Sequence, residues 1–512
     1  MLSSLQVTGE NAFSYSYNGR NQLSSVTNPN SVQVSFTGAC PERKRGDDAD
    51  RRTRITDPGS YVEFLYNARD WITDVRNRTT GGTTRYDASY SYNDSTLWDN
   101  VGNPLKRTEN IAGSTYTTTL RYDAVYRETE ETKRDSSNNV VYSLSYSYDA
   151  CGNRLTRALG GTTNYYGYDD NNKLTRIGST QGGSDLATFS YDNNGNMTEV
   201  YGALYGRKTL TYTDENYLAS IAYAGTTDYY SYTLDGRRCR ATLGGTTYRY
   251  LYDGQRVVED LADSGSVQAR YTTEDGTYNG VMLHLYRVTG ALSRFPMYDS
   301  AGSVRGLLDA SGTVTDLYEL DTFGRSISTS GSTPNDYRFG GGWGYITDPS
   351  GMLQLGVRHY WPELGLFLQQ DPPRNSAASY LYADANPVTG LDPTGLLSFR
   401  VCWDRYWSVD TTGPTTWGPW VYSITCQLQM GVNWVSRQFY RWGWAQHISR
   451  LYKDHCCISY CGHWSYGCTT TLVSTTYSCV YDTDFDLVTV NLGWWIGFGG
   501  GCWHEHPTPV HP

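Results

Sequence analysis

The chain alternates aromatic and small polar residues over short stretches, and each stretch ends in a turn-forming group. The recurring phrase is aromatic-x-Tyr-(Asp/Asn)-x-x-Gly-(Arg/Asn)-x-(Leu/Met)-Thr, with clear copies at 15–20, 146–156, 166–175, 189–198 and 230–237. Alternation with a period of two puts both aromatic rings on one face of a strand. Asp-x-x-Gly then turns the chain, because glycine adopts positive φ angles that other residues avoid. The Leu-Thr segment returns as the partner strand, so each phrase predicts one β-hairpin.

The phrase recurs at a nearly constant interval. Its second tyrosine steps by 20, 23, 21, 20 and 20 residues through Tyr148, Tyr168, Tyr191, Tyr212, Tyr232 and Tyr252. A fixed period of this length is typical of repeat architectures, in which one unit buries its apolar face only by stacking on its neighbours. We therefore expect a continuous stacked sheet, and we expect the repeated aspartates to be turn residues rather than catalytic acids.

Composition supports an all-β chain and argues against several functions. The 512 residues include 46 Tyr and 53 Gly, and tyrosine favours strands. The formal charge of −10 argues against a nucleic-acid partner, which would select for a basic face. No stretch is long and apolar enough to predict a membrane span. The N-terminus lacks the basic start and apolar core of a signal peptide, and it lies within the repeat pattern, so we expect the C-terminal portion of a longer protein.

A non-repetitive block, Tyr298 to Leu396, separates the repeats from a tail of different composition. Its phrases include Tyr318-Glu319-Leu320-Asp321-Thr322-Phe323-Gly324-Arg325, Phe367-Leu368-Gln369-Gln370-Asp371-Pro372 and Leu391-Asp392-Pro393-Thr394-Gly395-Leu396. Such a sharp change of pattern predicts a boundary between a repetitive container and a separate segment.

The repeated phrase resembles the YD (tyrosine-aspartate) repeat of the Rhs family, which is shared with the C components of bacterial Tc toxins and with teneurins. The block resembles the Rhs repeat-associated core. The resemblance implies hairpins stacked into a spiralling hollow β-shell, closed by the core. It divides the chain into a YD-repeat shell at 1–296, the core at 297–397 and a variable Cys/Trp-rich domain at 398–512.

The same resemblance implies an aspartyl protease that cuts its own chain once. In the toxin relatives this core cleaves just after its Asp-Pro-x-Gly-Leu element and leaves the C-terminal segment inside. Asp371 and Asp392 match the two Asp-Pro positions, with Asp384 as a third carboxylate that could replace one of them. Two carboxyls that share one proton supply a base for water and an acid for the leaving amide. The expected cut follows Leu396, with Leu397 as the neighbouring option.

Three departures from the family pattern bear on this prediction. Gln370 stands where an arginine usually precedes the first aspartate, and Leu366 stands where an arginine usually follows Gly365. Residues 340–345 read Gly-Gly-Gly-Trp-Gly-Tyr in place of a Thr-Gly-Arg/Lys-Glu-Tyr-Asp phrase. A lost cation removes help in holding an aspartate ionised. The alternative is that Asp371 and Asp392 only cap turns.

The tail holds eight of the eleven cysteines and eleven of the fifteen tryptophans. This density resembles a disulfide framework in an exported domain, although the pairing cannot be read from sequence. A zinc site is the alternative, since soft ligands cluster in this region, but the spacing matches no standard zinc pattern. The cysteines are Cys402, Cys426, Cys456, Cys457, Cys461, Cys468, Cys479 and Cys502, and the nearby histidines include His455, His463, His504 and His506.

Two classes of function fit these features. The first is a shell that encloses or displays its own C-terminal segment, of polymorphic-toxin type, with self-cleavage after Leu396 and with an immunity protein or a secretion apparatus as partner. The second is an adhesion protein at the cell surface, whose exposed aromatic faces stack on carbohydrate. Both predict a secreted or cell-surface protein, and neither calls for a cofactor or a metal.

Overall fold

The computed structural model describes two compact units, whose main parts are Met1–Pro372 with Ala377–Val401, and Cys402–Ser459 with Tyr466–Pro512. The described residues are 4–5, 13–17, 23–37, 53–69, 71–93, 101–254, 256–273, 281–371, 379–396 and 399–400. Six strands between 402 and 495 are described by their backbone alone.

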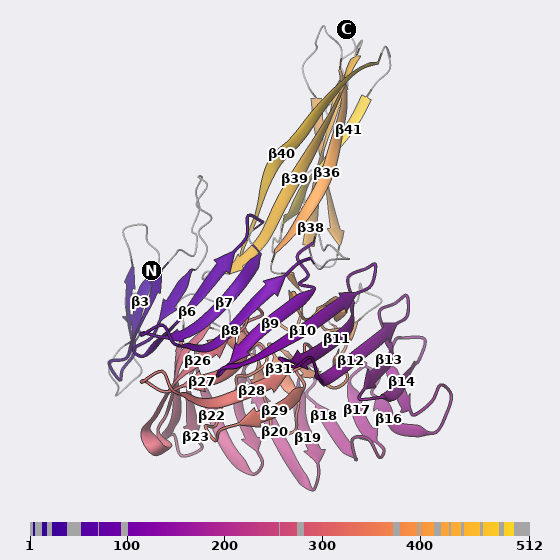
Figure 1. Ribbon diagram of the computed structural model, residues 1–512. Coiled ribbons are helices and arrows are strands. Elements are labelled where there is room, and N and C mark those ends of the chain that lie inside the picture. The colour runs from indigo at the N-terminus through magenta and orange to yellow at the C-terminus, as the bar shows by residue number, and fades with distance from the viewer. Residues whose placement is uncertain are drawn as a thin grey trace. The chain divides into compact units, whose positions relative to one another are not determined.

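The first unit is dominated by one antiparallel strip in which each strand pairs with the strand before it and the strand after it (Figure 1). Its first part comprises β1 (Ser4–Leu5), β2 (Phe13–Tyr17), β3 (Leu23–Thr27), β4 (Gln33–Thr37), β5 (Arg54–Thr56), β6 (Ser60–Tyr66), β7 (Ile72–Thr79), β8 (Thr84–Ser91), β9 (Lys106–Ile111), β10 (Ser114–Tyr122), β11 (Glu128–Asp135) and β12 (Val140–Tyr148).

The strip continues through the most regular repeats. These strands are β13 (Arg154–Leu159), β14 (Thr162–Tyr168), β15 (Leu174–Gly178), β16 (Asp185–Tyr191), β17 (Met197–Tyr201), β18 (Lys208–Tyr212), β19 (Leu218–Tyr223), β20 (Thr226–Tyr232), β21 (Arg238–Leu243), β22 (Thr246–Asp253) and β23 (Arg256–Ala262). It ends with β24 (Val267–Thr273), β25 (Met282–Arg287), β26 (Leu292–Tyr298), β27 (Val304–Leu308), β28 (Val314–Leu320) and β29 (Ser326–Ser330).

The repeated Asp-x-x-Gly groups form the predicted turns. The Asp192 carboxylate accepts the backbone N–H groups of Asn194 and Asn196 at 2.9 and 2.8 Å, and the Gly195 N–H donates to the Asp192 carbonyl. Gly195 has a φ of 85°, which suits glycine and closes the hairpin with a bulge. Asp169 accepts the corresponding two N–H groups. These aspartates are turn residues, as the repeat predicted.

In several copies of the repeated phrase, the second tyrosine ties its strand to the neighbouring strand. The hydroxyl groups of four such tyrosines donate to backbone carbonyls 14 or 15 residues earlier, at 2.7–3.1 Å. The pairs are Tyr168 with Arg154, Tyr212 with Met197, Tyr232 with Leu218 and Tyr252 with Arg238. Phenylalanine would fill the same space but could not satisfy these carbonyls, which explains why tyrosine recurs.

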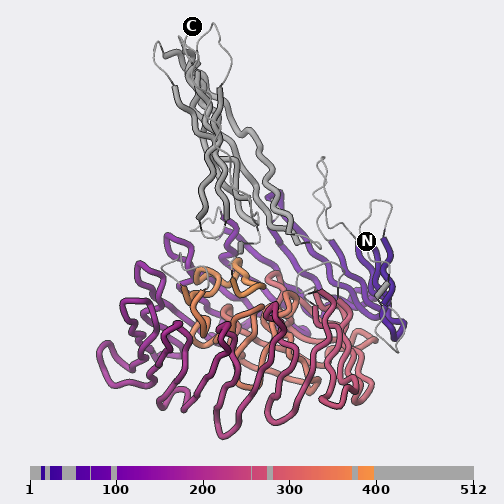
Figure 2. Tube along the Cα trace, turned by 180° about the vertical axis from the view of Figure 1, so that it is seen from behind, coloured from indigo at the N-terminus to yellow at the C-terminus, as the bar shows by residue number. Residues whose placement is uncertain are grey.

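The strip curves until the strands near its start pack against the strands near its end. A single apolar cluster joins residues of β2–β8 to Leu283, Phe295, Met297 and Leu308. Across this seam the Asn77 side-chain amide donates to the Tyr298 carbonyl at 3.2 Å and accepts the Tyr298 N–H at 3.3 Å. The Asn28 amide donates to Thr272 and His284. The trace seen from behind in Figure 2 follows this winding, with the orange segment of the core inside the curve.

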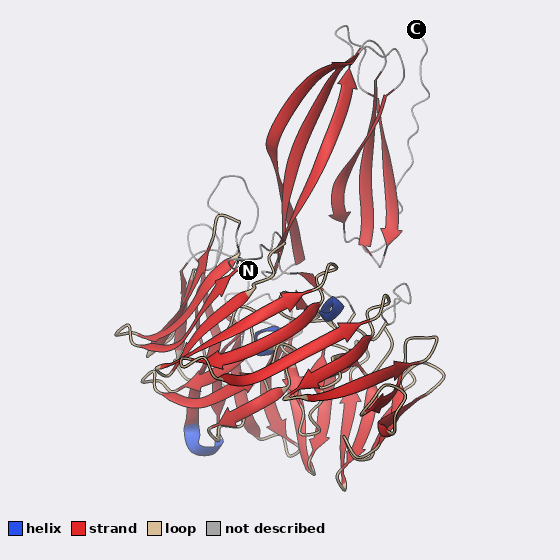
Figure 3. Cartoon of the chain, turned by 45° about the vertical axis from the view of Figure 1, so that its right-hand side comes forward, coloured by secondary structure: helices blue, strands red, loops and turns tan. Residues whose placement is uncertain are grey.

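The core segment fills the concave side of the strip. It contains a small sheet of β30 (Ile346–Thr347), β31 (Leu353–Leu355), β32 (Arg358–Trp361) and β33 (Leu366–Phe367), and the pair β34 (Gly390–Leu391) and β35 (Phe399–Arg400). The helical turns, blue in Figure 3, are the short 3₁₀ elements η1 (Thr289–Ala291), η2 (Gly341–Trp343) and η3 (Ala383–Ala385).

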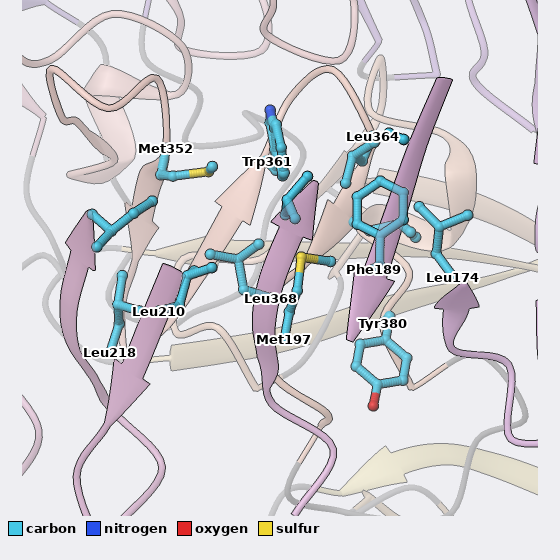
Figure 4. Packing of buried hydrophobic residues seen from close by; sticks show 14 of the residues in the cluster. Leu174, Phe189, Met197, Leu210, Leu218, Met352, Trp361, Leu364, Leu368 and Tyr380 are labelled. Atoms are coloured by element: carbon cyan, nitrogen blue, oxygen red, sulfur yellow. The ribbon is translucent and has the colours of Figure 1, made fainter. Parts of the chain in front are cut away.

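Apolar side chains join the core to the inner face of the strip. Met352, Trp361, Leu364, Leu368 and Tyr380 pack with residues of β14–β21 in one buried cluster (Figure 4). Burial of aliphatic and aromatic side chains contributes roughly 1.5–3 kcal/mol per residue relative to exposure. The strip therefore depends on the core for the burial of its inner face, as stacked repeats require.

One ion pair between strip and core is wholly buried. The Arg238 guanidinium at the start of β21 donates to both oxygens of Asp348, at 2.9 and 3.0 Å, and both side chains are 0% exposed. Burial by itself would raise the pKa of Asp348, but the charge and hydrogen bonds of Arg238, with His359 3.8 Å away, outweigh it, and the pKa is lowered.

The second unit forms two three-stranded sheets. One contains β36 (Cys402–Gly413), β39 (Ala445–Tyr460) and β40 (Trp464–Val480), and the other contains β37 (Val421–Gln429), β38 (Val432–Arg441) and β41 (Asp486–Trp495). The predicted disulfides and the alternative zinc ligands depend on side chains of this unit that lie outside the described set.

The prediction of an all-β chain with stacked YD hairpins is confirmed. The described residues form strands, turns and three short 3₁₀ elements. Among the helices described, none has the length and apolar character to span a membrane.

Candidate functional site: a carboxylate pair in the core

Asp392 lies directly after β34, in the interior of the core. Its side chain is 0% exposed. Its backbone N–H donates to the hydroxyl of Tyr345 at 2.8 Å, and Tyr345 lies within hydrogen-bond reach of Tyr382. A carboxylate taken this far from water costs several kcal/mol unless a cation and hydrogen bonds compensate it. The surroundings of Asp392 supply both.

The compensating cation is Arg358, the first residue of β32. Its Nη2 donates to Asp392 Oδ2 at 2.9 Å and lies 3.9 Å from Asp371 Oδ2. The guanidinium packs over the Phe367 ring, 3.6 Å from its centroid. One buried arginine thus faces both aspartates of the predicted pair, and the structure brings Asp371 and Asp392 together.

Asp371 differs from Asp392 in its access to solvent. Its side chain is 21% exposed, and its backbone N–H donates to the Ser379 carbonyl at 2.9 Å. Burial raises the pKa of Asp371 to about 6, against the lowering effect of Arg358 and with a further rise from the charge of Asp392. Its Oδ1 is buried and has no hydrogen-bond partner among the described residues, so solvent reaches the carboxyl through its other atoms. A carboxyl with a free oxygen and a pKa near neutrality suits proton transfer.

The Asp-Pro-Thr-Gly-Leu element folds back onto this pair. Asp392 Oδ1 accepts the Leu396 N–H at 3.1 Å and the Thr394 hydroxyl at 3.3 Å. Arg358 Nε donates to the carbonyl of Gly395. The same two charged groups therefore hold the backbone immediately before the expected cut. Leu396 is half-buried, whereas Leu397 lies outside the described residues.

Asp384, the third predicted carboxylate, lies in η3 and is exposed. It has a left-handed backbone, with a φ of 53°, as do its neighbours Ala383 and Ala385. Non-glycine residues rarely adopt this conformation, so three in succession mark a backbone held by its surroundings. Its exposure contrasts with the buried position of Asp392.

The departures from the family pattern have structural explanations. The cation that the sequence lacks at Gln370 is supplied by Arg358, from a neighbouring strand. Leu366 is buried in the apolar cluster shared with the strip, where an arginine would need a partner. In the Gly-rich phrase, Tyr345 accepts the N–H of Asp392, and the Trp343 indole donates to Ala301 at 3.0 Å.

Sequence reasoning missed Arg358. It looked for a cation next to Asp371 along the chain, whereas the cation lies 13 positions earlier. The signal in the sequence is Arg358-His359-Tyr360, which stands shortly before the phrase that contains Asp371. The antiparallel β31–β32–β33 arrangement brings that arginine to the carboxylates.

Comparison with known proteins finds relatives that match about half of the chain. No family model matches the chain. It is similar to the tRNA3(Ser)-specific nuclease WapA of Bacillus spizizenii, at 30% identity over 271 residues, which is 49% of this chain and 11% of that protein. It is also similar to the double-stranded DNA deaminase toxin A of Burkholderia cenocepacia, at 24% identity over 334 residues, 58% of this chain and 22% of that protein. The chain thus spans a minor part of the length of these relatives.

Among solved structures, the Photorhabdus luminescens Tc holotoxin pore matches 78% of this chain and 27% of its own chain, with 14% identity and a TM-score of 0.31. A score this low carries no argument about the fold, which rests on the strand pairing itself. That pairing, the Tyr-Asp turns and the enclosed core with its carboxylate pair define the class of YD-repeat β-shell proteins. Over about half of its length the chain is similar in sequence to the WapA proteins, and its repeats and core resemble those of the Rhs family.

Proposed function

We propose that this chain is a polymorphic-toxin-type protein in which residues 1–396 form the container and residues 397–512 are the segment that it delivers. The matching relatives are named for different activities, tRNA cleavage and DNA deamination, yet each shares a long stretch with this chain. If the shared region is a container, proteins that carry different toxic segments would be expected to have it in common. The enclosed segment, an immunity protein and a secretion apparatus are the partners that this function calls for, at a cell surface or outside the cell.

The carboxylate pair is proposed to release that segment by one self-cleavage after Leu396. The observation that carries this proposal is the double engagement of the Asp-Pro-Thr-Gly-Leu element. Asp392 accepts the Leu396 N–H, and Arg358 binds both Asp392 and the Gly395 carbonyl. These contacts support the peptide bond that follows Leu396 as the bond that is cut.

Each group has a distinct role in the proposed reaction. Asp392 is ion-paired with Arg358 and has both oxygens occupied, so it anchors the backbone as a carboxylate. Asp371 retains a free Oδ1, and it takes a proton from a water molecule that attacks the Leu396 carbonyl carbon. As the bond between that carbon and the Leu397 nitrogen breaks, Asp371 returns the proton to the nitrogen. The products are a new carboxylate at Leu396 and a new amine at Leu397.

Denaturing gels of the purified full chain test this function. Wild-type protein is expected to give two fragments, 1–396 and 397–512, and Asp371→Asn a single full-length chain. Asp384→Asn is the matched control, since it removes the exposed carboxylate and is expected to leave cleavage intact. N-terminal sequencing of the small fragment should read from Leu397. Uncut wild-type chain after prolonged incubation would exclude self-cleavage.

The pH dependence of the cleavage rate should follow Asp371. Because burial raises the pKa of Asp371 to about 6, this carboxyl is protonated below that pH and cannot accept a proton. The rate of conversion of full-length chain is therefore expected to fall by about tenfold per pH unit below pH 6 and to level off above it. A rate that instead falls as the pH rises through 6 would mean that Asp371 is the proton donor.

A further inference from the structure

One turn of the strip touches the segment that carries Asp371. The turn lies between β16 and β17 at Asp192–Asn196, and the segment is Leu368–Asp371. The N–H of Met197 donates to the Leu368 carbonyl at 2.9 Å. The Tyr380 hydroxyl donates to the Gly195 carbonyl at 2.7 Å, in a contact that is buried although the residues are 185 positions apart.

Gly195 is packed too closely to carry a side chain. A Cβ at this position would lie 2.7 Å from the Tyr380 hydroxyl, 2.8 Å from Gln370 Oε1 and 3.2 Å from Gln370 Cβ. Carbon atoms in proteins do not approach other heavy atoms below 3.0 Å, so the neighbours would have to move. The turn and the core segment are thus fitted against each other without spare room.

Gln370 and Tyr380, which contact Gly195, are each linked to Asp371 through the backbone. Gln370 precedes Asp371 in the chain. Tyr380 follows Ser379, whose carbonyl accepts the Asp371 N–H. Tyr380 is also held from the strip side by the Tyr191 ring, with centroids 5.8 Å apart. A displacement at Gly195 therefore reaches Asp371 from two sides.

We propose that Gly195, Gln370 and Tyr380 are positioning residues for Asp371, so that the carboxylate site is complete only when the strip has wound round to β17. This inference rests on the proposed self-cleavage. It assigns to the Asp192–Asn196 turn a role in positioning Asp371, and it explains the side chain at position 370. Gln370 faces the strip here, while Arg358 supplies the charge.

The test compares Gly195→Ala with Gly245→Ala in the full chain. Both glycines have a φ of 85°, so alanine incurs the same backbone penalty, but no atom lies within 4 Å of a Cβ at Gly245. Gly245→Ala is expected to cleave at the wild-type rate. Gly195→Ala is expected to cleave roughly ten- to a hundredfold more slowly, since small misplacements of reacting groups have effects of this size.

A second readout separates positioning from loss of fold. If Gly195→Ala moves Asp371 toward water, the pH at which its cleavage rate falls should shift below that of wild type, because less burial lowers the pKa. Tyr380→Phe removes one hydrogen bond without backbone strain and should give a smaller change in the same direction. Urea midpoints of the variants identify any that unfold.

The outcomes separate the two proposals. Cleaved wild type with a slow Gly195→Ala and a normal Gly245→Ala supports the positioning role. Equal cleavage rates and equal pH profiles for the two glycine variants overturn it and leave self-cleavage standing. If Gly195→Ala is unfolded, an unchanged rate and pH profile in Tyr380→Phe overturn it instead. Uncut wild type overturns self-cleavage, and the positioning role falls with it.

Discussion

Replacing Arg358 with methionine is expected to abolish self-cleavage and to lower the free energy of unfolding of the first unit by about 3–5 kcal/mol. Methionine keeps much of the volume over the Phe367 ring but removes the charge. Asp392, with a fully buried side chain, would then lose the cation that lies 2.9 Å from its Oδ2, and the Gly395 carbonyl would lose its donor. Urea denaturation and denaturing gels measure the two effects.

Two further variants separate the cost of leaving Asp392 without a cation from the loss of the other contacts of Arg358. The double variant Arg358→Met with Asp392→Asn removes the orphaned charge, so it should recover part of the stability while staying uncleaved. Arg358→Lys keeps the positive charge but cannot reach Asp392 and the Gly395 carbonyl together, so its cleavage should be slowed and its stability less affected. A single Arg358→Met variant as stable as wild type would show that the ion pair is not needed to bury Asp392.

The second large effect is expected at the junction of strip and core. Arg238→Met should destabilise the first unit by about 3–5 kcal/mol, because it leaves the buried Asp348 carboxylate without its bidentate partner. The pKa of Asp348 is lowered in the folded protein, so the pair stabilises the native state above the unfolded pKa, and this contribution is lost as pH falls through the folded one. The defect should therefore be largest at neutral pH and shrink in acid.

An exposed pair on a neighbouring hairpin provides the control. Arg207 lies 2.9 Å from Glu199, but its side chain is 67% exposed, so Arg207→Met should change stability by less than about 1 kcal/mol. The double variant Arg238→Met with Asp348→Leu replaces the buried charges by apolar groups and should lie near wild type. Urea midpoints at pH 7 and at a pH below 3.8, the ordinary pKa of an aspartate, test all three. Equal losses at the buried and exposed pairs would contradict the argument.

The local part of the fold could be predicted from the sequence, because it depends on residues close along the chain. Tyr-x-Tyr and Asp-x-x-Gly specify strand, turn and bulge within about ten residues, and Asp192 and Gly195 behave as the pattern predicted. The seam could not be predicted. The Asn77–Tyr298 bonds join residues 221 positions apart, and nothing in the repeat distinguishes Asn77 from other polar strand residues.

For the candidate site too, only the parts that depend on residues close along the chain could be predicted. Asp371 and Asp392 were predicted because they match the two Asp-Pro positions of the Rhs core, and both lie within 4 Å of Arg358 in the structure. Arg358 itself was missed because its role depends on strand pairing within the core, which the phrase alone does not give. The fit of Gln370 against Gly195 is a contact between strip and core. Such contacts depend on how far the strip has curved, and the local repeat does not specify that.

The pairing of each strand with its chain neighbours also sets an order of assembly. Hairpins close short loops at little entropic cost, so the strip can form step by step as the chain leaves the ribosome. The seam bonds from Asn28 to Thr272 and His284 span 244 and 256 residues, and the bond from Tyr380 to Gly195 spans 185. These contacts must await the late part of the chain. During synthesis the strip can therefore form before the core that carries Asp371 and Asp392, so the proposed self-cleavage would have to wait for these late contacts.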